Sequence, residues 1–324
     1  MNRRRILVLF RTVMLSFIMG ALVSGCGSGK TDPGTDPGTE QGTGAVSAPS
    51  NDHATVSYLG PEGTYTEQAA RAFFSDAGKL LPKATVDEAI ADVEAGRADY
   101  AVVPQENTVG GTVTDYVDTL IAKEDIYVAG EVILPIRQTL MGVPGASVEE
   151  IRTVCSHAQG IAQSAEWRKE HLPDAKMQEM ESTAAAASYV AETGDRSIAA
   201  IAAPGAADLY GLSILAENVQ ITDANKTRFY VLSPSPLTGG RQARAVFVAD
   251  CEANWIDDII VAIHNSGLEL VAIHDRPEGS QLGSYYYIIE TEEEGGISEE
   301  KIKEIEAVSG VRFLGSFDSL EVSD

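Results

Sequence analysis

Short apolar segments alternate with amphipathic segments through residues 55–233, a pattern that predicts strands and helices following one another in an α/β sheet. Strands are predicted where β-branched or apolar residues cluster between turn signals. They are Thr55–Leu59, Tyr100–Val103, Arg152–Cys155, Met177–Met180 and Ile198–Ala202. The repeated order indicates the α/β fold class.

The helices of this region are predicted to begin at polar capping residues directly after strands. The starts are the capping box Thr64-Tyr65-Thr66-Glu67, Thr112 after the polar loop Pro104–Gly111, Ser156-His157 before a helix over Gln159–His171, and Ser182-Thr183 before a helix to Glu192. In open α/β sheets, ligands bind outside the carboxyl ends of strands, where helix N-termini suit carboxylates. Capping alone explains any one start, whereas the four together predict a cleft that binds a small anion.

Residues 243–322 follow a second pattern. Its predicted elements are strand Ala243–Ala249, helix Trp255–Ser266, strands Glu269–His274 and Ser284–Glu290, helix Ser298–Val308 and strand Arg312–Phe317. This βαββαβ order predicts a separate, ferredoxin-like domain.

The beginning of the chain has the composition of a signal peptide. Met1–Arg5 is basic, and an apolar run over Ile6–Val23 follows, interrupted by Arg11. The uninterrupted part is too short for a comfortable membrane span and suits a signal-peptide core. We therefore predict a signal peptide over residues 1–25.

The signal peptide ends in Val23-Ser24-Gly25-Cys26, which resembles a bacterial lipobox. We predict lipidation of Cys26, which holds a protein on a bilayer surface without a spanning helix. Residues 26–53, rich in Gly, Ser and Pro, are then a flexible tether. The protein is expected on the extracytoplasmic face of the cell membrane; the alternative is an ordinary buried cysteine after a signal anchor.

The net charge and the cysteine content of the chain exclude some classes of binding partner. The formal net charge is −24, and it becomes −28 without the four arginines that precede Cys26 (20 basic against 48 acidic residues). Such a field repels nucleic acid and anionic headgroups, so nucleic acid is not an expected partner. The three cysteines and five histidines are scattered, so no metal site is predicted.

Five blocks in residues 55–233 resemble motifs of the prephenate dehydratase family. They are Gly60-Pro61-Glu62-Gly63-Thr64-Tyr65-Thr66, Val103–Thr108 with Gly110–Val113, Ser156-His157-Ala158-Gln159, Ser182–Ala186, and Ala206–Leu212 followed by Asn225–Phe229. The resemblance implies a two-lobed catalytic domain over residues 54–233, similar to type 2 periplasmic binding proteins. The first lobe is expected over 55–132 and 215–233, and the second over 133–214.

The resemblance also implies a carbon–oxygen lyase that converts prephenate into phenylpyruvate without a cofactor. It gives the central role to Thr227, whose hydroxyl acts on the leaving hydroxyl, with Glu106 and Asn107 as further catalytic residues. The residues implied for substrate binding are Thr64, Thr108, Ser156, His157, Gln159, Ser182, Thr183, Asn225, Arg228 and Phe229. A structural ion pair is an equal alternative for Arg228, and core packing is favoured over catalysis for Phe229.

Three positions depart from the family pattern. Thr108 replaces a serine, Ala158 replaces a proline, and Gln105 stands where an apolar residue is usual. None of these changes removes a group that the chemistry needs.

Residues 243–322 match the element order of an ACT domain, which in this family binds phenylalanine. His274-Asp275-Arg276-Pro277 resembles the effector motif but keeps only Arg and Pro, so Asp275, Arg276 and Pro277 are the candidate effector residues. Glu252-Ala253-Asn254-Trp255 replaces the second motif of the family. Phenylalanine binding and a structural or dimerising role therefore both stay open, and a homodimer or homotetramer is expected.

Two other functions fit parts of the sequence. A solute-binding lipoprotein for a small carboxylate fits the lipobox, the tether and the anion cleft, but it has no need for Thr227 with Glu106 and Asn107. Arogenate, which differs from prephenate by an amino group, is a further possible substrate.

Overall fold

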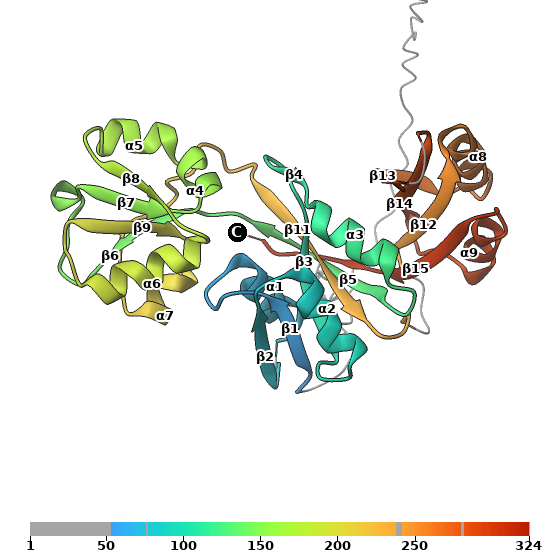
Figure 1. Cartoon of the computed structure of the whole chain (residues 1–324), viewed down its shortest axis with the longest axis horizontal. Coiled ribbons are helices and arrows are strands. Elements are labelled where there is room, and N and C mark those ends of the chain that lie inside the picture. Colours follow the sequence, from blue (N-terminus) through green and yellow to red (C-terminus); the bar gives the residue numbers. More distant parts are fainter. Residues whose placement is uncertain (1–52, 76, 238–241, 280–281, 324) are drawn as a thin grey trace, which may run out of the picture. The chain divides into compact units, whose positions relative to one another are not determined.

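The computed structural model describes residues 53–75, 77–237, 242–279 and 282–323 (Figure 1). All of them belong to one compact unit, Ala45–Asp324. The predicted signal peptide, the lipidated Cys26 and the tether up to residue 52 lie outside the described residues and stay predictions. Within the described ranges, no helix combines the length and hydrophobicity needed to cross a membrane.

The first lobe is built on a seven-stranded sheet with the order β16-β5-β11-β3-β1-β2 and β4 paired to β3. The strands are β1 (Thr55–Leu59), β2 (Lys79–Lys83), β3 (Tyr100–Asn107), β4 (Gly111–Thr112), β5 (Tyr127–Pro135), β11 (Lys226–Ser233) and β16 (Ser319–Glu321). Helix α1 (Tyr65–Phe73) packs on one face, and helices α2 (Val86–Glu94) and α3 (Thr114–Ala122) pack on the other. Strand β11 lies between β3 and β5, in the middle of the sheet (Figure 1).

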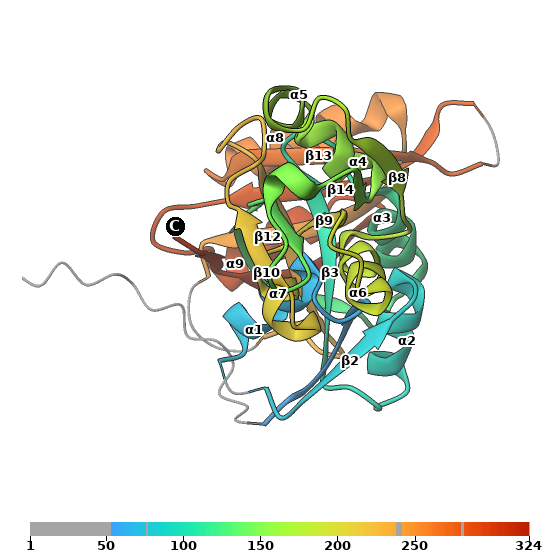
Figure 2. The ribbon, with the colours of Figure 1, turned by 90° about the vertical axis from the view of Figure 1, so that its left-hand side faces the viewer.

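The second lobe contains a five-stranded sheet with the order β10-β6-β9-β7-β8. Its elements are β6 (Thr139–Gly142), β7 (Thr153–Ser156), α4 (Ala158–Gln163), α5 (Ala165–His171), β8 (Lys176–Glu179), α6 (Thr183–Thr193), β9 (Ile198–Ala202), α7 (Gly205–Tyr210) and β10 (Ser213–Ala216). Helices α6 and α7 pack on one face of the sheet and α5 on the other (Figure 2).

The chain passes between the lobes twice, after β5 and before β11. The two passages are hydrogen-bonded to each other, with Ile136 N donating to Asn225 O (2.8 Å) and Val219 N donating to Gln138 O (2.9 Å). The two passages therefore form a hydrogen-bonded, two-stranded connection between the lobes.

The C-terminal domain (residues 243–317) has a four-stranded antiparallel sheet with the order β13-β14-β12-β15. Its elements are β12 (Arg244–Glu252), α8 (Ile256–Asn265), β13 (Glu269–Pro277), β14 (Ser284–Glu292), α9 (Glu299–Glu306) and β15 (Val311–Phe317). One face of the sheet packs on α8 and α9. The other face packs on the first lobe, where Ile288 and Phe317 share a buried apolar cluster with Tyr116 and Tyr230.

After β15 the chain returns to the first lobe, because β16 pairs in parallel with β5. Ser319 is aligned with Glu131 and Glu321 with Ile133 in this pairing. The last strand of the chain is therefore an edge strand of the catalytic sheet.

The predicted fold class is confirmed, with two α/β lobes and a βαββαβ domain. Three local predictions were wrong. Thr112 does not start a helix, because it belongs to strand β4, and α3 begins at Thr114 after Val113, which makes no side-chain capping bond. Strand β3 continues through Pro104 to Asn107, because this part of the chain still pairs with strand β11, with Pro104 opposite Phe229 and Asn107 opposite Thr227. The helix predicted over Gln159–His171 is two helices that meet at Ser164, whose Oγ donates to Gly160 O (2.7 Å) and so favours a bend.

Candidate active site

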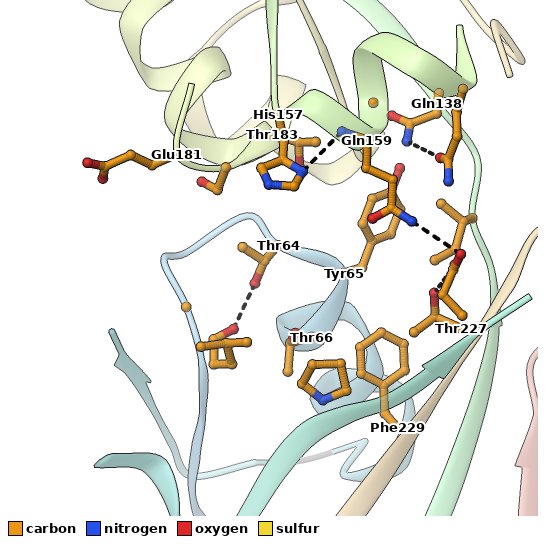
Figure 3. A pocket seen from close by; sticks show the side chains of 18 of the residues that line it. Thr64, Tyr65, Thr66, Gln138, His157, Gln159, Glu181, Thr183, Thr227 and Phe229 are labelled. Atoms are coloured by element: carbon orange, nitrogen blue, oxygen red, sulfur yellow. Dashed lines mark hydrogen bonds between the residues drawn. The ribbon is translucent and has the colours of Figure 1, made fainter. Parts of the chain in front are cut away.

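A cavity of about 360 Å³ is lined by residues of both lobes (Figure 3). The first lobe contributes the start of α1 and the ends of β3 and β11, and the second lobe contributes the starts of α4 and α6. The lining residues are Leu59, Gly60, Thr64, Tyr65, Thr66, Ala84, Pro104, Asn107, Ile136, Gln138, His157, Gln159, Gly160, Gln163, Glu181, Ser182, Thr183, Thr227 and Phe229. The predicted cleft thus corresponds to a cavity at the helix N-termini.

Thr227 and Asn107 face each other at one wall of this cavity. They are cross-strand neighbours on β11 and β3, and Asn107 Nδ2 donates to Thr227 Oγ1 at 2.8 Å. Asn107 is itself held, because its Oδ1 accepts from the backbone N–H groups of Val109 (3.0 Å) and Gly110 (2.8 Å). Since Thr227 Oγ1 accepts from the amide, its own hydroxyl hydrogen is available to a bound molecule.

One hydrogen bond crosses the cavity from the second lobe to this pair. Gln159, in the first turn of α4, donates from Nε2 to Asn107 Oδ1 at 3.2 Å (Figure 3). The result is a chain of side chains, Gln159 to Asn107 to Thr227, that links the lobes at the cavity. Movement of one lobe against the other would change the position of the Asn107 amide.

Two helices present their N-termini to the cavity. Thr64 caps α1 by accepting from Glu67 N (3.4 Å), and Ser182 caps α6 by accepting from Ala185 N (2.9 Å). Thr183, the first residue of α6, also lines the cavity. The remaining N–H groups of these first turns and the positive ends of the helix dipoles favour an anion.

The cavity is suited to carboxylates through neutral donors. Among its lining residues in the described part of the chain, none is Lys or Arg, and Glu181 is acidic. His157 caps the short helix α4, its Nδ1 accepting from Gln159 N (3.3 Å). Burial raises the pKa of the Tyr65 phenol, which donates to Arg137 O (2.6 Å) and stays protonated at neutral pH.

Glu106 and Arg228, two of the predicted site residues, are not among the residues that line the cavity. Alternation along β11 places Arg228 on the face opposite Thr227, and a β-bulge in β3 places Glu106 on that same face. Arg228 pairs with Glu106 but Phe229 pairs with Pro104, so Gln105 is an extra residue on β3. The bulge brings the Glu106 carboxylate to the Arg228 guanidinium (3.3 Å), on the face of the sheet opposite Thr227 and Phe229.

Three other predicted site residues do not line the cavity, and their side chains form hydrogen bonds with other groups of the protein. Ser156 is fully buried and donates from Oγ to Ile201 O (2.7 Å). Thr108 Oγ1 donates to Ala224 O (3.2 Å). Asn225 is buried, and its Oδ1 accepts from Asn107 Nδ2 (2.9 Å), so it positions the Asn107 amide from behind.

Gln138 and Gln163 line the cavity and were missed from the sequence. Gln138 belongs to the first passage between the lobes and is buried, and its Nε2 donates to Gln163 Oε1 at 3.1 Å. Neither residue stands in a helix cap or turn motif, so local sequence patterns contain no signal for them. Gln138 reaches the cavity on the first passage between the lobes and Gln163 at the end of α4, so only the tertiary structure brings the two side chains together.

Arg228 is the centre of a polar cluster on the far side of the sheet. It contacts Glu131, Glu106 and Glu290, the last from strand β14 of the C-terminal domain. Burial opposes the charge on Arg228, but the carboxylates of Glu290 and Glu131 outweigh this effect and raise its pKa. The structural ion pair considered for Arg228 is therefore what the structure contains.

The geometry of the cavity does not by itself identify a reaction, and comparison with known proteins indicates which family the chain resembles. The family model for prephenate dehydratase matches residues 56–236. A prephenate dehydratase from Amycolatopsis methanolica is 34% identical over 272 residues, which cover 81% of this chain and 88% of that protein. A bifunctional chorismate mutase/prephenate dehydratase from Neisseria gonorrhoeae is 35% identical over 240 residues, and this chain spans 66% of its length.

Solved structures are similar over most of the described chain. The prephenate dehydratase of Arthrobacter aurescens, crystallised in complex with L-Phe, is 31% identical with a TM-score of 0.73, over 82% of this chain and 90% of that one. The prephenate dehydratase of Staphylococcus aureus is 26% identical with a TM-score of 0.68, over 81% of this chain and 99% of that one.

Proposed function

Because the chain belongs to the prephenate dehydratase family, we propose that the cavity between its lobes converts prephenate into phenylpyruvate, carbon dioxide and water. The observation that supports the site most directly is the hydrogen bond from Asn107 to Thr227 at the cavity wall. The reaction breaks the bond from the ring to its carboxylate and the bond from the ring to its hydroxyl. The electron pair left by carbon dioxide completes the aromatic ring as hydroxide departs.

One proton is needed, because the leaving hydroxide must depart as water. The Thr227 hydroxyl is placed to donate toward it, since Thr227 Oγ1 already accepts from the Asn107 amide, and solvent returns the proton to Thr227 to complete the cycle. Donation of a proton to a leaving group typically accelerates a reaction by about 10²–10⁴-fold. Thr227 is thus the catalytic residue, and Asn107 positions it.

The two carboxylates of prephenate require separate binding groups. The α1 N-terminus lies in the first lobe and the α6 N-terminus in the second, and both open on the cavity. We assign one carboxylate to each helix start, with the free N–H groups of the first turns as donors and Thr183 as a hydroxyl donor. A dianion held in this way joins the lobes and favours their closure around the substrate.

The interlobe hydrogen bond of Gln159 predicts the effect of a Gln159→Leu variant. The apolar side chain has a similar size but removes the donor to Asn107 Oδ1. We expect kcat/KM for prephenate to fall about tenfold, the effect of one lost hydrogen bond of ordinary strength. Gln178→Leu, a change on strand β8 outside the cavity lining, is the matched control and should stay near the wild-type value. Equal kcat/KM for both variants would contradict the assigned role.

A direct assay tests the proposed function. The chain from Ala54 to Asp324 is incubated with prephenate while phenylpyruvate is followed, and with arogenate while phenylalanine is followed, each beside a buffer blank. We expect phenylpyruvate formation well above the blank. If the folded protein converts prephenate no faster than the blank does, the dehydratase activity is rejected. If it converts arogenate alone, the activity is assigned to the amino analogue.

One candidate effector residue, Arg276, and its neighbour in the motif, His274, contact the first lobe. Arg276 forms an ion pair with Asp118 of helix α3 (2.5 Å), and His274 Nδ1 lies 2.9 Å from Thr112 Oγ1. We therefore propose that these two side chains fasten the C-terminal domain to the catalytic domain. These contacts support the structural role over phenylalanine binding for this part of the motif.

A further inference from the structure

Glu290 is a buried carboxylate that the proposed reaction does not use. It belongs to strand β14 of the C-terminal domain and is 1% exposed. Its Oε2 contacts the Arg228 guanidinium, and its Oε1 accepts from the Tyr230 hydroxyl (2.6 Å) and from Gln105 Nε2. All three of these hydrogen-bonding partners belong to the first lobe, and from its own domain His274 Nε2 lies 3.8 Å from Glu290 Oε1.

A buried carboxylate is costly unless charged and polar groups surround it. The first lobe supplies a guanidinium, a phenol and an amide for this one group. Gln105, which stands where the family pattern has an apolar residue, is fully buried and is directed to it. The departure at Gln105 therefore has a specific partner in this chain, the carboxylate of the C-terminal domain.

The residues that bind Glu290 are also those that shape the catalytic wall. Arg228 follows Thr227 directly on β11, and alternation along the strand places their side chains on opposite faces of the sheet. Gln105 is the extra residue of the bulge in β3, and this bulge brings Asn107 opposite Thr227. Bulges commonly re-aim a side chain near an active site. Glu290 therefore contacts the bulge residue and the neighbour of the catalytic threonine from behind.

We propose that Glu290 is a positioning residue for the dehydratase reaction, which fixes Arg228 and the β3 bulge and thereby holds Thr227 and Asn107 in their catalytic geometry. The C-terminal domain is in this way a part of the catalytic unit. The inference rests on the proposed role of Thr227, and it extends that role to a residue of another domain.

The test compares Glu290→Gln with wild type in prephenate turnover. The amide keeps the size of the side chain but removes one of the three carboxylate charges that hold Arg228, the only one of the three from the C-terminal domain. A displacement of about 1 Å at a reacting group can cost about 10²-fold in rate, so we expect kcat to fall between about 10- and 100-fold. KM should change less than about twofold, because the groups assigned to the carboxylates lie on α1 and α6 and are untouched.

Asp118→Asn is the matched control. It makes the same acid-to-amide change at the same domain interface, but its partner Arg276 is attached to neither β3 nor β11. We expect Asp118→Asn to keep kcat within about twofold of wild type. A general loosening of the interface would lower kcat in both variants and would overturn the inference.

Two further variants keep the test decisive if Glu290→Gln does not fold. Glu290→Asp retains the charge and Arg228→Lys retains the opposite charge, and both weaken the pair without leaving a lone buried ion. Each should lower kcat at nearly constant KM, by less than Glu290→Gln. Folded Glu290→Asp and Arg228→Lys proteins with wild-type kcat would refute the positioning role, whereas failure of wild type itself to turn over prephenate would refute the proposed function instead.

Discussion

Replacing Thr227 by alanine is expected to lower kcat for prephenate by about 10²–10⁴-fold, the usual contribution of a positioned proton donor. The structure gives the reason, since Thr227 Oγ1 accepts from Asn107 and its hydrogen remains available to the leaving hydroxyl. The measurement is steady-state formation of phenylpyruvate, with circular dichroism to establish that the variant is folded. A folded Thr227→Ala protein within about tenfold of the wild-type kcat would contradict the assignment.

Thr119→Ala is a suitable control for this experiment. Thr119 is 8% exposed, as is Thr227, but it lies on helix α3 outside the cavity lining and donates to Asp115 O (2.8 Å). The Thr119→Ala change therefore removes the same atoms from an equally buried side chain and leaves the residues that line the cavity unchanged. Its kcat should stay near wild type, which separates loss of the catalytic hydroxyl from loss of a buried threonine.

Gly315→Ala is expected to lower the free energy of unfolding by about 3 kcal/mol, from overpacking together with backbone strain. Gly315 lies on β15, where the C-terminal domain approaches strand β5 of the first lobe. A Cβ at this position would lie 2.1 Å from Val128 O, and the backbone φ of +144° is one that other residues rarely adopt. Because the obstacle is backbone, the strands must separate. Urea denaturation of both proteins measures the difference.

Gly145→Ala distinguishes the two causes of that loss. Gly145 has a φ of +84°, but a Cβ there meets nothing within 4 Å. Its substitution should cost about 1 kcal/mol, from backbone conformation alone. Equal losses for Gly315→Ala and Gly145→Ala would show that the close approach of β15 to β5 is unimportant. A larger loss at Gly315, with a lower kcat, would support the link between domain docking and the catalytic wall.

Much of the cavity was predictable because it is built from local signals. Thr64, His157 and Ser182 are helix caps, and a cap is recognisable from a polar residue placed between a strand and a helix. The sequence order of these caps matched a family, which in turn named Thr227 and Asn107. Both line the cavity.

The face of the sheet on which the side chains of Glu106 and Arg228 lie was not predictable from local signals. Motif residues that are adjacent in sequence were expected to share one site, yet adjacent strand residues point to opposite faces. In addition, the bulge at Gln105 shifts β3 by one residue relative to β11. A bulge has no distinct sequence signal here, so the face that each side chain takes depends on how the two strands pair.

The sequence by itself predicted five strands of the two lobes, the helix caps at Thr64, His157 and Ser182, and the βαββαβ order of the C-terminal domain, because each depends on residues close together in the chain. Only the tertiary structure decided that Gln138 and Gln163 meet at the cavity, that β16 returns to the first sheet, and that Glu290 reaches Arg228. The physical reason is separation along the chain. Contacts between residues far apart form only when sheets pack and strands pair, and neither composition nor periodicity records which distant partners will meet.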